Sequence, residues 1–283
     1  MMITVITPTY NRAELVQATI KSVLAQSYTD WELVLVDDGS TDNTEEAIQH
    51  FLSDKRISYH KKHNSGQADS LNYGVARAKG EFIVFLDSDD EAYPNWLETV
   101  VKEITPELGV LSVGAIRKFS DGSTIEEGMN VFHLFGESIK LKFTCGSFFI
   151  RKEVFDAVGG YDISLNSNIQ TDLGYRILAH LRKVNLHYKV VPGYLMQINV
   201  HLGERIRTNW NRRREGGMKF LKKHYDFLYQ YDKKEISNIY AAIAFSSHKL
   251  RLKKEAVGLL LKAIQHNPFR FINYLRVVRY AIS

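Results

Sequence analysis

The sequence contains a single cysteine, Cys145, and only five prolines in 283 residues. One cysteine excludes an intramolecular disulfide and fits a reducing compartment, where a buried structural thiol is the expected role of Cys145. No stretch approaches the roughly 18 consecutive apolar residues of a membrane span, and the N-terminus lacks the basic flank of a signal peptide. These absences predict a cytoplasmic protein.

Two common phosphate-binding loops are also missing. The chain has no Gly-x-x-x-x-Gly-Lys-Ser/Thr loop, which argues against a P-loop nucleotide hydrolase. The segment TPTYN (7–11) follows the first expected strand, where a dinucleotide-binding enzyme would carry Gly-x-Gly-x-x-Gly. A nucleotide site in this protein must therefore be built in another way.

The charge is divided unevenly along the chain. Residues 1–200 contain 19 Lys and Arg against 26 Asp and Glu, a net charge of −7. Residues 201–283 contain 18 against 6, a net charge of +12. A basic end suggests an anionic partner. We do not expect nucleic acid, because the first part is acidic and no nucleic-acid motif occurs.

An anionic membrane surface is the partner that the basic segment favours. Cationic residues at 212–214 and 222–223 alternate with aromatic ones, namely Trp210, Phe220 and Tyr225. Such a mixture is typical of peripheral membrane contact. The alternative is a helical cap whose apolar residues pack inward and whose charges are solvated. If the segment binds lipid, the protein lies on the inner face of the cell membrane.

Short apolar runs alternate with helix-period segments over the first hundred residues, a pattern typical of a mostly parallel sheet flanked by helices. We expect strands at 3–7, 31–36, 57–60 and 82–86 and helices at 15–26, 42–51 and 67–79. Asp42 and Glu45 have the spacing of a capping box, and Gly80 is expected as a left-handed helix cap. Beyond residue 105 the pattern is mixed, and from about 210 it predicts helices only.

The most hydrophobic expected strand ends in a group of carboxylates. In GEFIVFLDSDDEAYPNW (80–96), five apolar residues lead directly into Asp87, Asp89 and Asp90. The strand at 31–36 likewise leads into Asp37 and Asp38. Ligands of parallel α/β sheets bind at the carboxyl ends of the strands. Alternate residues of an extended segment point the same way, so Asp87 and Asp89 can converge on one hard cation such as Mg²⁺.

A divalent cation held by one or two carboxylates keeps room for phosphate oxygens, so this site predicts a phosphorylated ligand. An Asp-x-Asp at a strand end more often forms only a turn. An aspartyl-phosphate enzyme or receiver domain could use Asp87 as its nucleophile, but that reading leaves Asp37 and Asp38 unexplained.

The order of several motifs resembles family 2 glycosyltransferases. They are TPTYNR (7–12), VDDGSTD (36–42), NSG (64–66), NYG (72–74), AKGE (78–81), FLDSDD (85–90), GSFFIR (146–151), GGYD (159–162) and TDLGYR (171–176). The resemblance implies an α/β GT-A fold, a Rossmann-like and mostly parallel sheet flanked by helices, with a C-terminal α-helical extension. Its catalytic domain would span 1–205, with a nucleotide-sugar half at about 1–105 and an acceptor half at about 106–205. The basic extension would span 206–283.

The same resemblance assigns roles to individual residues. It places the nucleotide of the donor against Pro8, Thr9, Tyr10, Arg12 and Ser88. Asp38 would accept a hydrogen bond from the base, and Asp87 would contact the ribose. Asp89, with His201, would hold a Mn²⁺ or Mg²⁺ ion on the diphosphate.

The base that removes the acceptor's proton would be Asp172, and a helix N-cap is the plainer alternative. The preceding residue is usually Glu in the family and is Thr171 here, which makes the acceptor class harder to predict. Arg176 also matches a family arginine, or it pairs only with a carboxylate on its own helix.

The resulting hypothesis is a metal-dependent inverting glycosyltransferase. The donor would be a nucleotide-diphosphate sugar, with a UDP-sugar favoured, and the acceptor a glycan or lipid-linked saccharide of a bacterial surface polysaccharide. The alternatives are a non-catalytic nucleotide-sugar-binding partner subunit and a sugar nucleotidylyltransferase. The second would normally carry a glycine-rich loop with a basic residue after the first strand, which this sequence lacks.

Overall fold

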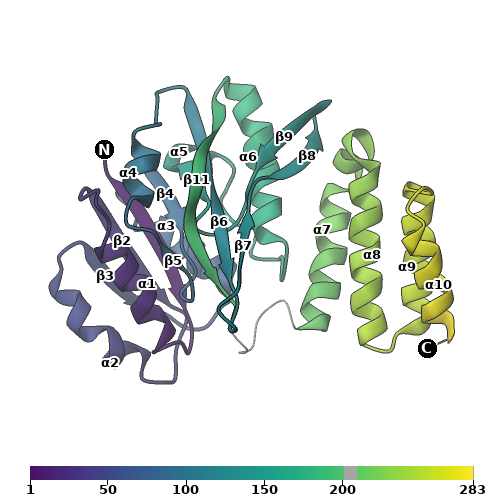
Figure 1. The fold of residues 1–283 in the computed structure, drawn as a ribbon, viewed down its shortest axis with the longest axis horizontal. Helices are drawn as coiled ribbons and strands as arrows, with labels where there is room; N and C mark the ends of the chain where they lie inside the picture. The colour runs from purple at the N-terminus through teal and green to yellow at the C-terminus, as the bar shows by residue number, and fades with distance from the viewer. Residues whose placement is uncertain (201–208, 283) are drawn as a thin grey trace. The chain divides into compact units, whose positions relative to one another are not determined.

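The computed structural model describes residues 1–200 and 209–282. The chain divides into two compact units (Figure 1). The first comprises Met1–Asn130, Lys140–Ile163 and Gln170–Leu202, and the second comprises Val131–Ile139, Ser164–Ile169 and Gly203–Ser283. Each unit is described by itself.

The first unit is a mixed α/β structure. Its strands are β1 (Ile3–Thr9), β2 (Trp31–Asp37), β3 (Ile57–Lys61), β4 (Phe82–Phe85), β5 (Glu91–Ala92), β6 (Leu108–Lys118), β7 (Thr124–Glu127), β10 (Phe148–Arg151) and β11 (His187–Asn199). Its helices are α1 (Leu15–Leu24), α2 (Thr44–Ile48), η1 (Gln49–Ser53), α3 (Gln67–Val75), α4 (Trp96–Val101), α5 (Lys152–Ala157) and α6 (Ile169–Val184). A separate hairpin of β8 (Asn130–Leu134) and β9 (Glu137–Leu141) belongs largely to the second unit.

The described residues form a nine-stranded sheet in the order β3-β2-β1-β4-β10-β6-β11-β5, with β7 paired to β6. Strands β1 to β4 are parallel where they pair, whereas β10 is antiparallel to β4 and β6. Thr9 pairs with Asp37, and Ile6 pairs with Phe85. The carboxyl ends of β1 to β4 therefore share one edge, where the sequence places its carboxylates. The expected α/β fold with a mostly parallel sheet is confirmed.

Alternate strand residues supply the two apolar faces of this sheet. Ile3, Val5 and Leu33 belong to a buried cluster that also contains residues of α1 and α4. The opposite face carries Ile6. Helix α3 packs against this side chain at Gly74, where the absence of a Cβ atom allows the close approach. Both faces are buried, which explains the continuous apolar runs of β1, β2 and β4.

Two local predictions near these strands are wrong. Helix α3 ends at Val75, and Gly80 is not among the residues with positive φ. Glycine is needed there because a Cβ atom would lie 2.6 Å from the backbone nitrogen of Thr4. The capping box at Asp42 also fails, since the N-cap of α2 is Asn43, whose side chain makes no capping hydrogen bond.

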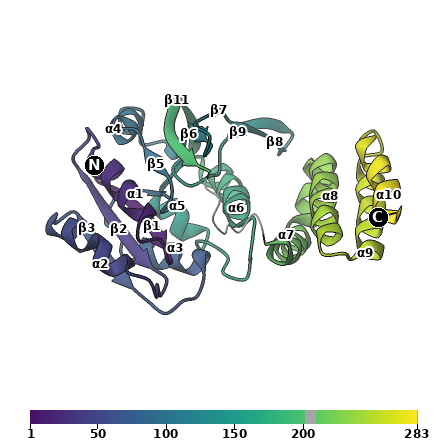
Figure 2. The same ribbon diagram turned by 60° about the horizontal axis from the view of Figure 1, so that its bottom comes forward.

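The second unit contains four helices within its described residues: α7 (Trp210–Tyr231), α8 (Lys233–Lys249), α9 (Lys253–His266) and α10 (Ile272–Ile282). They lie side by side in chain order, with α10 outermost, in both views (Figures 1 and 2). Asn209 and Asp232 cap α7 and α8 by accepting hydrogen bonds from the nitrogens of Arg212 and Glu235. None of the helices in the described ranges combines the length and the apolar character needed to cross a bilayer.

Two aromatic residues of the segment expected to touch a membrane take part in the packing of the helices. Phe220 is buried in α7, and the ring of Trp210 packs against Phe245 of α8. Arg214 forms an ion pair with Glu255 of α9 at 2.6 Å. Phe220 and Trp210 therefore contribute to the packing of the helices, whereas Arg212, Lys222 and Lys223 are exposed.

Candidate active site

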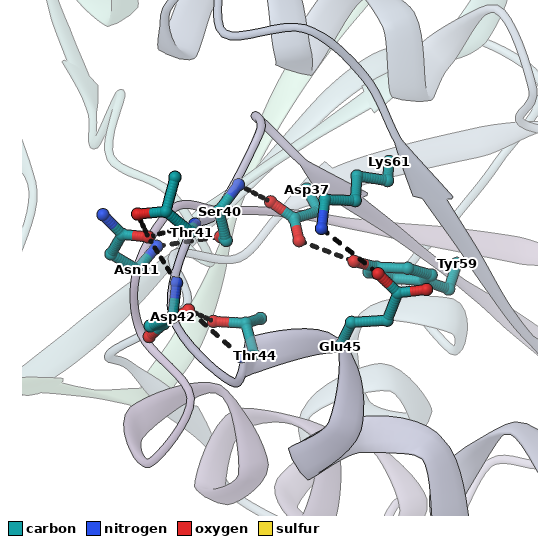
Figure 3. A network of polar contacts seen from close by, with 9 residues as sticks. All are labelled: Asn11, Asp37, Ser40, Thr41, Asp42, Thr44, Glu45, Tyr59 and Lys61. Atoms are coloured by element: carbon teal, nitrogen blue, oxygen red, sulfur yellow. Dashed lines mark hydrogen bonds and ion pairs between the residues drawn. The ribbon is translucent and has the colours of Figure 1, made fainter.

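The loop after β2 is fixed by buried hydrogen bonds. The carboxylate of Asp37 is fully buried and accepts from the backbone nitrogen of Ser40 at 2.7 Å and the hydroxyl of Tyr59 at 2.6 Å (Figure 3). Burial and the hydrogen bond to Asp37 raise the pKa of Tyr59. Asp37 is thus a structural residue that holds the loop against β3.

Asn11 joins the loop after β1 to the loop after β2. It adopts a left-handed conformation with φ of 51°, which asparagine tolerates better than most residues. Its backbone nitrogen donates to Ser40 Oγ at 2.9 Å, and its side-chain oxygen accepts from the nitrogen of Thr41 at 2.8 Å (Figure 3). The two loops therefore form one rigid wall at the edge of the sheet.

Asp38 is held from three sides. Its carboxylate accepts from Lys62 Nζ at 2.6 Å and from the backbone nitrogens of Ser65 at 2.9 Å and Gly66 at 2.8 Å. Burial by itself would raise the pKa of Asp38, but these hydrogen bonds outweigh it and hold the pKa below its usual value. At least three of about four acceptor positions of this carboxylate are occupied, so its direction is fixed.

Asp87, Asp89 and Asp90 gather at the end of β4. Each offers a carboxylate oxygen, and these oxygens lie within 4.8 Å of one another. Asp89 forms an ion pair with Arg12 at 2.6 Å. Asp87 accepts from the side chain of Gln67 at 3.1 Å. A hard divalent cation fits this set of oxygen donors, and the guanidinium of Arg12 lies where such a positive charge would be favoured.

The backbone of the acidic cluster is braced by two other elements. Thr19 of α1 donates its hydroxyl to the carbonyl oxygen of Asp90 at 2.7 Å. Asn199, at the end of β11, donates its backbone nitrogen to the Asp90 carboxylate at 2.9 Å and its side chain to the carbonyl oxygen of Asp89 at 2.9 Å. The carboxylates consequently stand on rigid supports.

A buried polar chain lies beside the cluster. Gln170 donates to the sulfur of Cys145 at 3.0 Å and accepts from the hydroxyl of Tyr161 at 2.7 Å. Burial, and then the negative charge of Asp87, raise the pKa of Cys145 well above its usual value. The thiol is therefore protonated at neutral pH, and the predicted burial of Cys145 is confirmed.

Asp172 is the fourth residue of α6 and is fully buried. Arg176, one turn later, donates to the Asp172 carboxylate at 3.0 Å and 2.6 Å and to the carbonyl oxygen of Val158 at 2.7 Å. Asp172 thus lies inside the first turn and is not the N-cap that the plainer interpretation expected. The pair is rigid, because Arg176 is itself anchored to the backbone.

The structure brings most of the predicted site residues to one edge of the sheet. Pro8 and Thr9 are buried at the end of β1, and Tyr10 is exposed beside them. Ser88 is buried within the acidic segment. The predicted metal ligand His201 lies outside the part of the chain that the structure describes.

Sequence reasoning gave no role to Lys62, Gln67 or Asn199. The only signal for Lys62 was a basic pair directly after an expected strand, and Gln67 and Asn199 carried none that separates them from other polar residues. Their roles come from distant segments of the chain that meet in the folded structure.

The sequence profile of glycosyl transferase family 2 matches residues 4–161. Among curated proteins, the chain is 35% identical over 137 residues to glycosyltransferase GlyA of Streptococcus pneumoniae, covering 48% of this chain and 19% of GlyA. It is 41% identical over 99 residues to the putative teichuronic acid biosynthesis glycosyltransferase TuaG of Bacillus subtilis, covering 34% of this chain and 39% of TuaG. The matches thus span about a fifth and two fifths of those relatives' lengths.

Solved structures show the same fold. Residues 1–349 of Staphylococcus aureus TarS, in complex with UDP-GlcNAc, align with a TM-score of 0.66 and 18% identity over 99% of this chain and 89% of that one. The mannosyltransferase PcManGT of Pyrobaculum calidifontis, in complex with GDP-Man and Mn²⁺, aligns with a TM-score of 0.57 and 18% identity over 99% and 84% of the two chains. The GT-A expectation is confirmed by these neighbours.

Proposed function

Because the chain belongs to glycosyl transferase family 2, we propose that it is a metal-dependent inverting glycosyltransferase that uses a nucleotide-diphosphate sugar, with a UDP-sugar favoured. The observation that carries this proposal is the group of three carboxylates at the end of β4, with oxygens within 4.8 Å. They lie on the sheet edge to which the rigid loops after β1 and β2 also lead. Two structural neighbours were solved with UDP-GlcNAc and GDP-Man, which supports a nucleotide-sugar donor.

The donor nucleotide is proposed to lie along Pro8, Thr9 and Tyr10, with Ser88 close to the ribose. Asp38 is proposed to accept a hydrogen bond from a base NH group, and its lowered pKa keeps that carboxylate ionised at neutral pH. An NH acceptor at this place suits uracil or thymine. Lys62 and the two backbone nitrogens fix the direction in which the Asp38 carboxylate points.

Asp89 is the proposed ligand of a Mn²⁺ or Mg²⁺ ion, with Asp87 on the ribose side. When bound, such an ion supplies the positive charge that stabilises a departing diphosphate. Arg12 pairs with Asp89 in this structure. We propose that Arg12 turns to the donor phosphates when the cation takes its place, since a guanidinium suits phosphate equally well.

Asp172 is the proposed general base. Arg176 fixes the direction of its carboxylate through two hydrogen bonds, which suits a group that must accept a proton from an acceptor hydroxyl. Asp172 has no exposed surface in this structure. Its role as a base therefore requires that acceptor binding opens a path to it. The name of TuaG, a relative, refers to teichuronic acid biosynthesis, and we propose a surface glycan or lipid-linked saccharide as the acceptor.

Calorimetric titration of UDP, dTDP, GDP and CMP, with and without Mn²⁺, tests the proposal. The wild type should bind one nucleotide, with UDP expected, and should need Mn²⁺ for tight binding. Asp89→Asn should lose the effect of Mn²⁺, whereas Glu153→Gln, an exposed carboxylate on α5, should keep it. Absence of binding by all four nucleotides would refute a donor site at this edge.

A further inference from the structure

The outer face of α10 is apolar and exposed. Leu275, Val278 and Ile282 are 67%, 59% and 80% exposed. Their spacing of three and four residues places them on one stripe of the helix. Asn273 and Tyr280, seven residues apart, are the buried residues of α10 and occupy the opposite face. The exposed stripe is thus directed away from the rest of the helical unit.

The turn before α10 extends this apolar surface. Phe269 is 82% exposed and Phe271 is 74% exposed. Together with the stripe, five large apolar side chains are presented within a short segment, and we call this set the α10 patch. Contiguous exposed apolar surface of this kind marks an interaction site in a folded protein.

The segment that carries the α10 patch has charged residues of one sign. Residues 256–283 contain no Asp or Glu but include Lys262, Arg270, Arg276 and Arg279. A hollow of about 310 Å³ beside the patch is lined by Arg270 and Arg276 together with Asn238 and Phe245 of α8. Guanidinium groups bind phosphate oxygens well. The surroundings of the patch are therefore suited to an anionic phosphate-bearing surface.

We propose that the α10 patch binds an anionic phospholipid bilayer, with Phe, Leu, Val and Ile side chains among the acyl chains and the arginines at the lipid phosphates. An amphipathic helix with aromatic and aliphatic residues on one face and arginines beside it binds bilayer interfaces in this way. A symmetric contact with a second copy would bring identical basic groups together, which is unfavourable. The proposal does not depend on the transferase activity.

Vesicle flotation with the 283-residue chain tests this inference without donor or acceptor. Vesicles are made of phosphatidylcholine alone or mixed with phosphatidylglycerol, at about 0.1 M salt, where charges near the surface still act. One variant replaces the stripe (Leu275→Gln, Val278→Gln, Ile282→Gln). A matched control replaces two exposed apolar residues of the first unit (Ile125→Gln, Ile163→Gln).

We expect the wild type and the control to float with anionic vesicles and much less with neutral ones. Each stripe side chain contributes about tenfold to partitioning, so the stripe variant should not float. In the double variant Arg276→Gln/Arg279→Gln, the partition constant should fall about 25-fold, because each arginine contributes about fivefold. Circular dichroism melting must show that the variants are folded, as expected for exposed positions.

Four results would overturn the inference. The wild type could fail to float with anionic vesicles, or the stripe variant could float as the wild type does. Sedimentation could instead show a dimer of the wild type that the stripe variant dissociates, which would assign the patch to a second copy. Equal flotation with neutral and anionic vesicles would remove the role assigned to the arginines and would also contradict the proposal as stated.

Discussion

Replacing Arg12 with glutamine should change the binding of two ligands in opposite directions. In the wild type, the guanidinium of Arg12 lies 2.6 Å from the carboxylate of Asp89, so a divalent cation must displace it. The variant removes this competitor and should bind Mn²⁺ more tightly. The same variant should bind the nucleotide less tightly in the presence of saturating Mn²⁺, because Arg12 can no longer reach the phosphates.

The size of the first effect follows from the burial of the pair. Two unit charges about 4 Å apart interact by about 4 kcal/mol near a protein surface, whereas exposed ion pairs contribute about 0.2–1 kcal/mol. The side chains of Arg12 and Asp89 are 25% and 14% exposed, between these limits. We take about 1.5 kcal/mol, which corresponds to about a tenfold gain in Mn²⁺ affinity.

Water proton relaxation measured during Mn²⁺ titration gives this affinity without any nucleotide. The matched control is Arg56→Gln, which breaks a similar ion pair with Asp54 at 2.7 Å away from the acidic cluster and should leave Mn²⁺ binding unchanged. If Arg12→Gln binds Mn²⁺ no better than the wild type while its melting temperature is unchanged, Asp89 is not the cation's ligand and the proposed site is wrong.

Three further variants test other parts of the structure. Asp172→Asn should lower turnover at least about 100-fold while donor affinity, measured by titration, stays within about twofold; equal loss of donor binding would contradict a role as base. Hydrogen bonds from Arg117 and Lys142 lower the pKa of Glu127 to about 2 in spite of burial, below its usual 4.5. The lowered pKa of Glu127 therefore stabilises the folded state by roughly 2 kcal/mol, after allowance for partial exposure. This stabilisation is complete above about pH 5 and is lost as the pH falls toward about 2. Urea unfolding should show that Glu127→Gln is less stable than the wild type near neutral pH and differs less in acid; a constant difference would refute the linkage. Gly80→Ala should destabilise the fold by about 1–3 kcal/mol because its Cβ meets backbone atoms, whereas Gly128→Ala, with no atom within 4 Å of its Cβ, should be neutral in the same melting experiment.

The central strands could be predicted because both faces of the sheet are buried. Such strands read as continuous apolar runs, and β1, β2 and β4 have buried residues at every position or nearly so. Strand β7 was missed because its residues are mostly exposed and show no alternation. Strand β5 has two residues, too few for any pattern.

The acidic clusters could be placed from sequence because parallel strands end at one edge. The hydrogen-bond partners of these carboxylates could not be predicted from the sequence. Lys62 reaches Asp38 from 24 residues away, and Asn199 reaches Asp90 from 109 residues away. Such contacts depend on how the strands are ordered in the sheet, which apolar patterns along the chain do not specify. The exposed face of α10 was missed for a similar reason, since burial decides which of many basic and aromatic residues face outward.

We propose above that a cation at Asp89 lies against the diphosphate of a nucleotide. The most direct measurement is ³¹P relaxation of UDP bound to the protein during Mn²⁺ titration, because a paramagnetic ion broadens only nearby nuclei. We expect strong broadening of both phosphate resonances, strongest for the β-phosphate, with loss of this effect in Asp89→Asn. Bound UDP whose phosphate resonances respond to Mn²⁺ no more in the wild type than in Asp89→Asn would contradict this proposal.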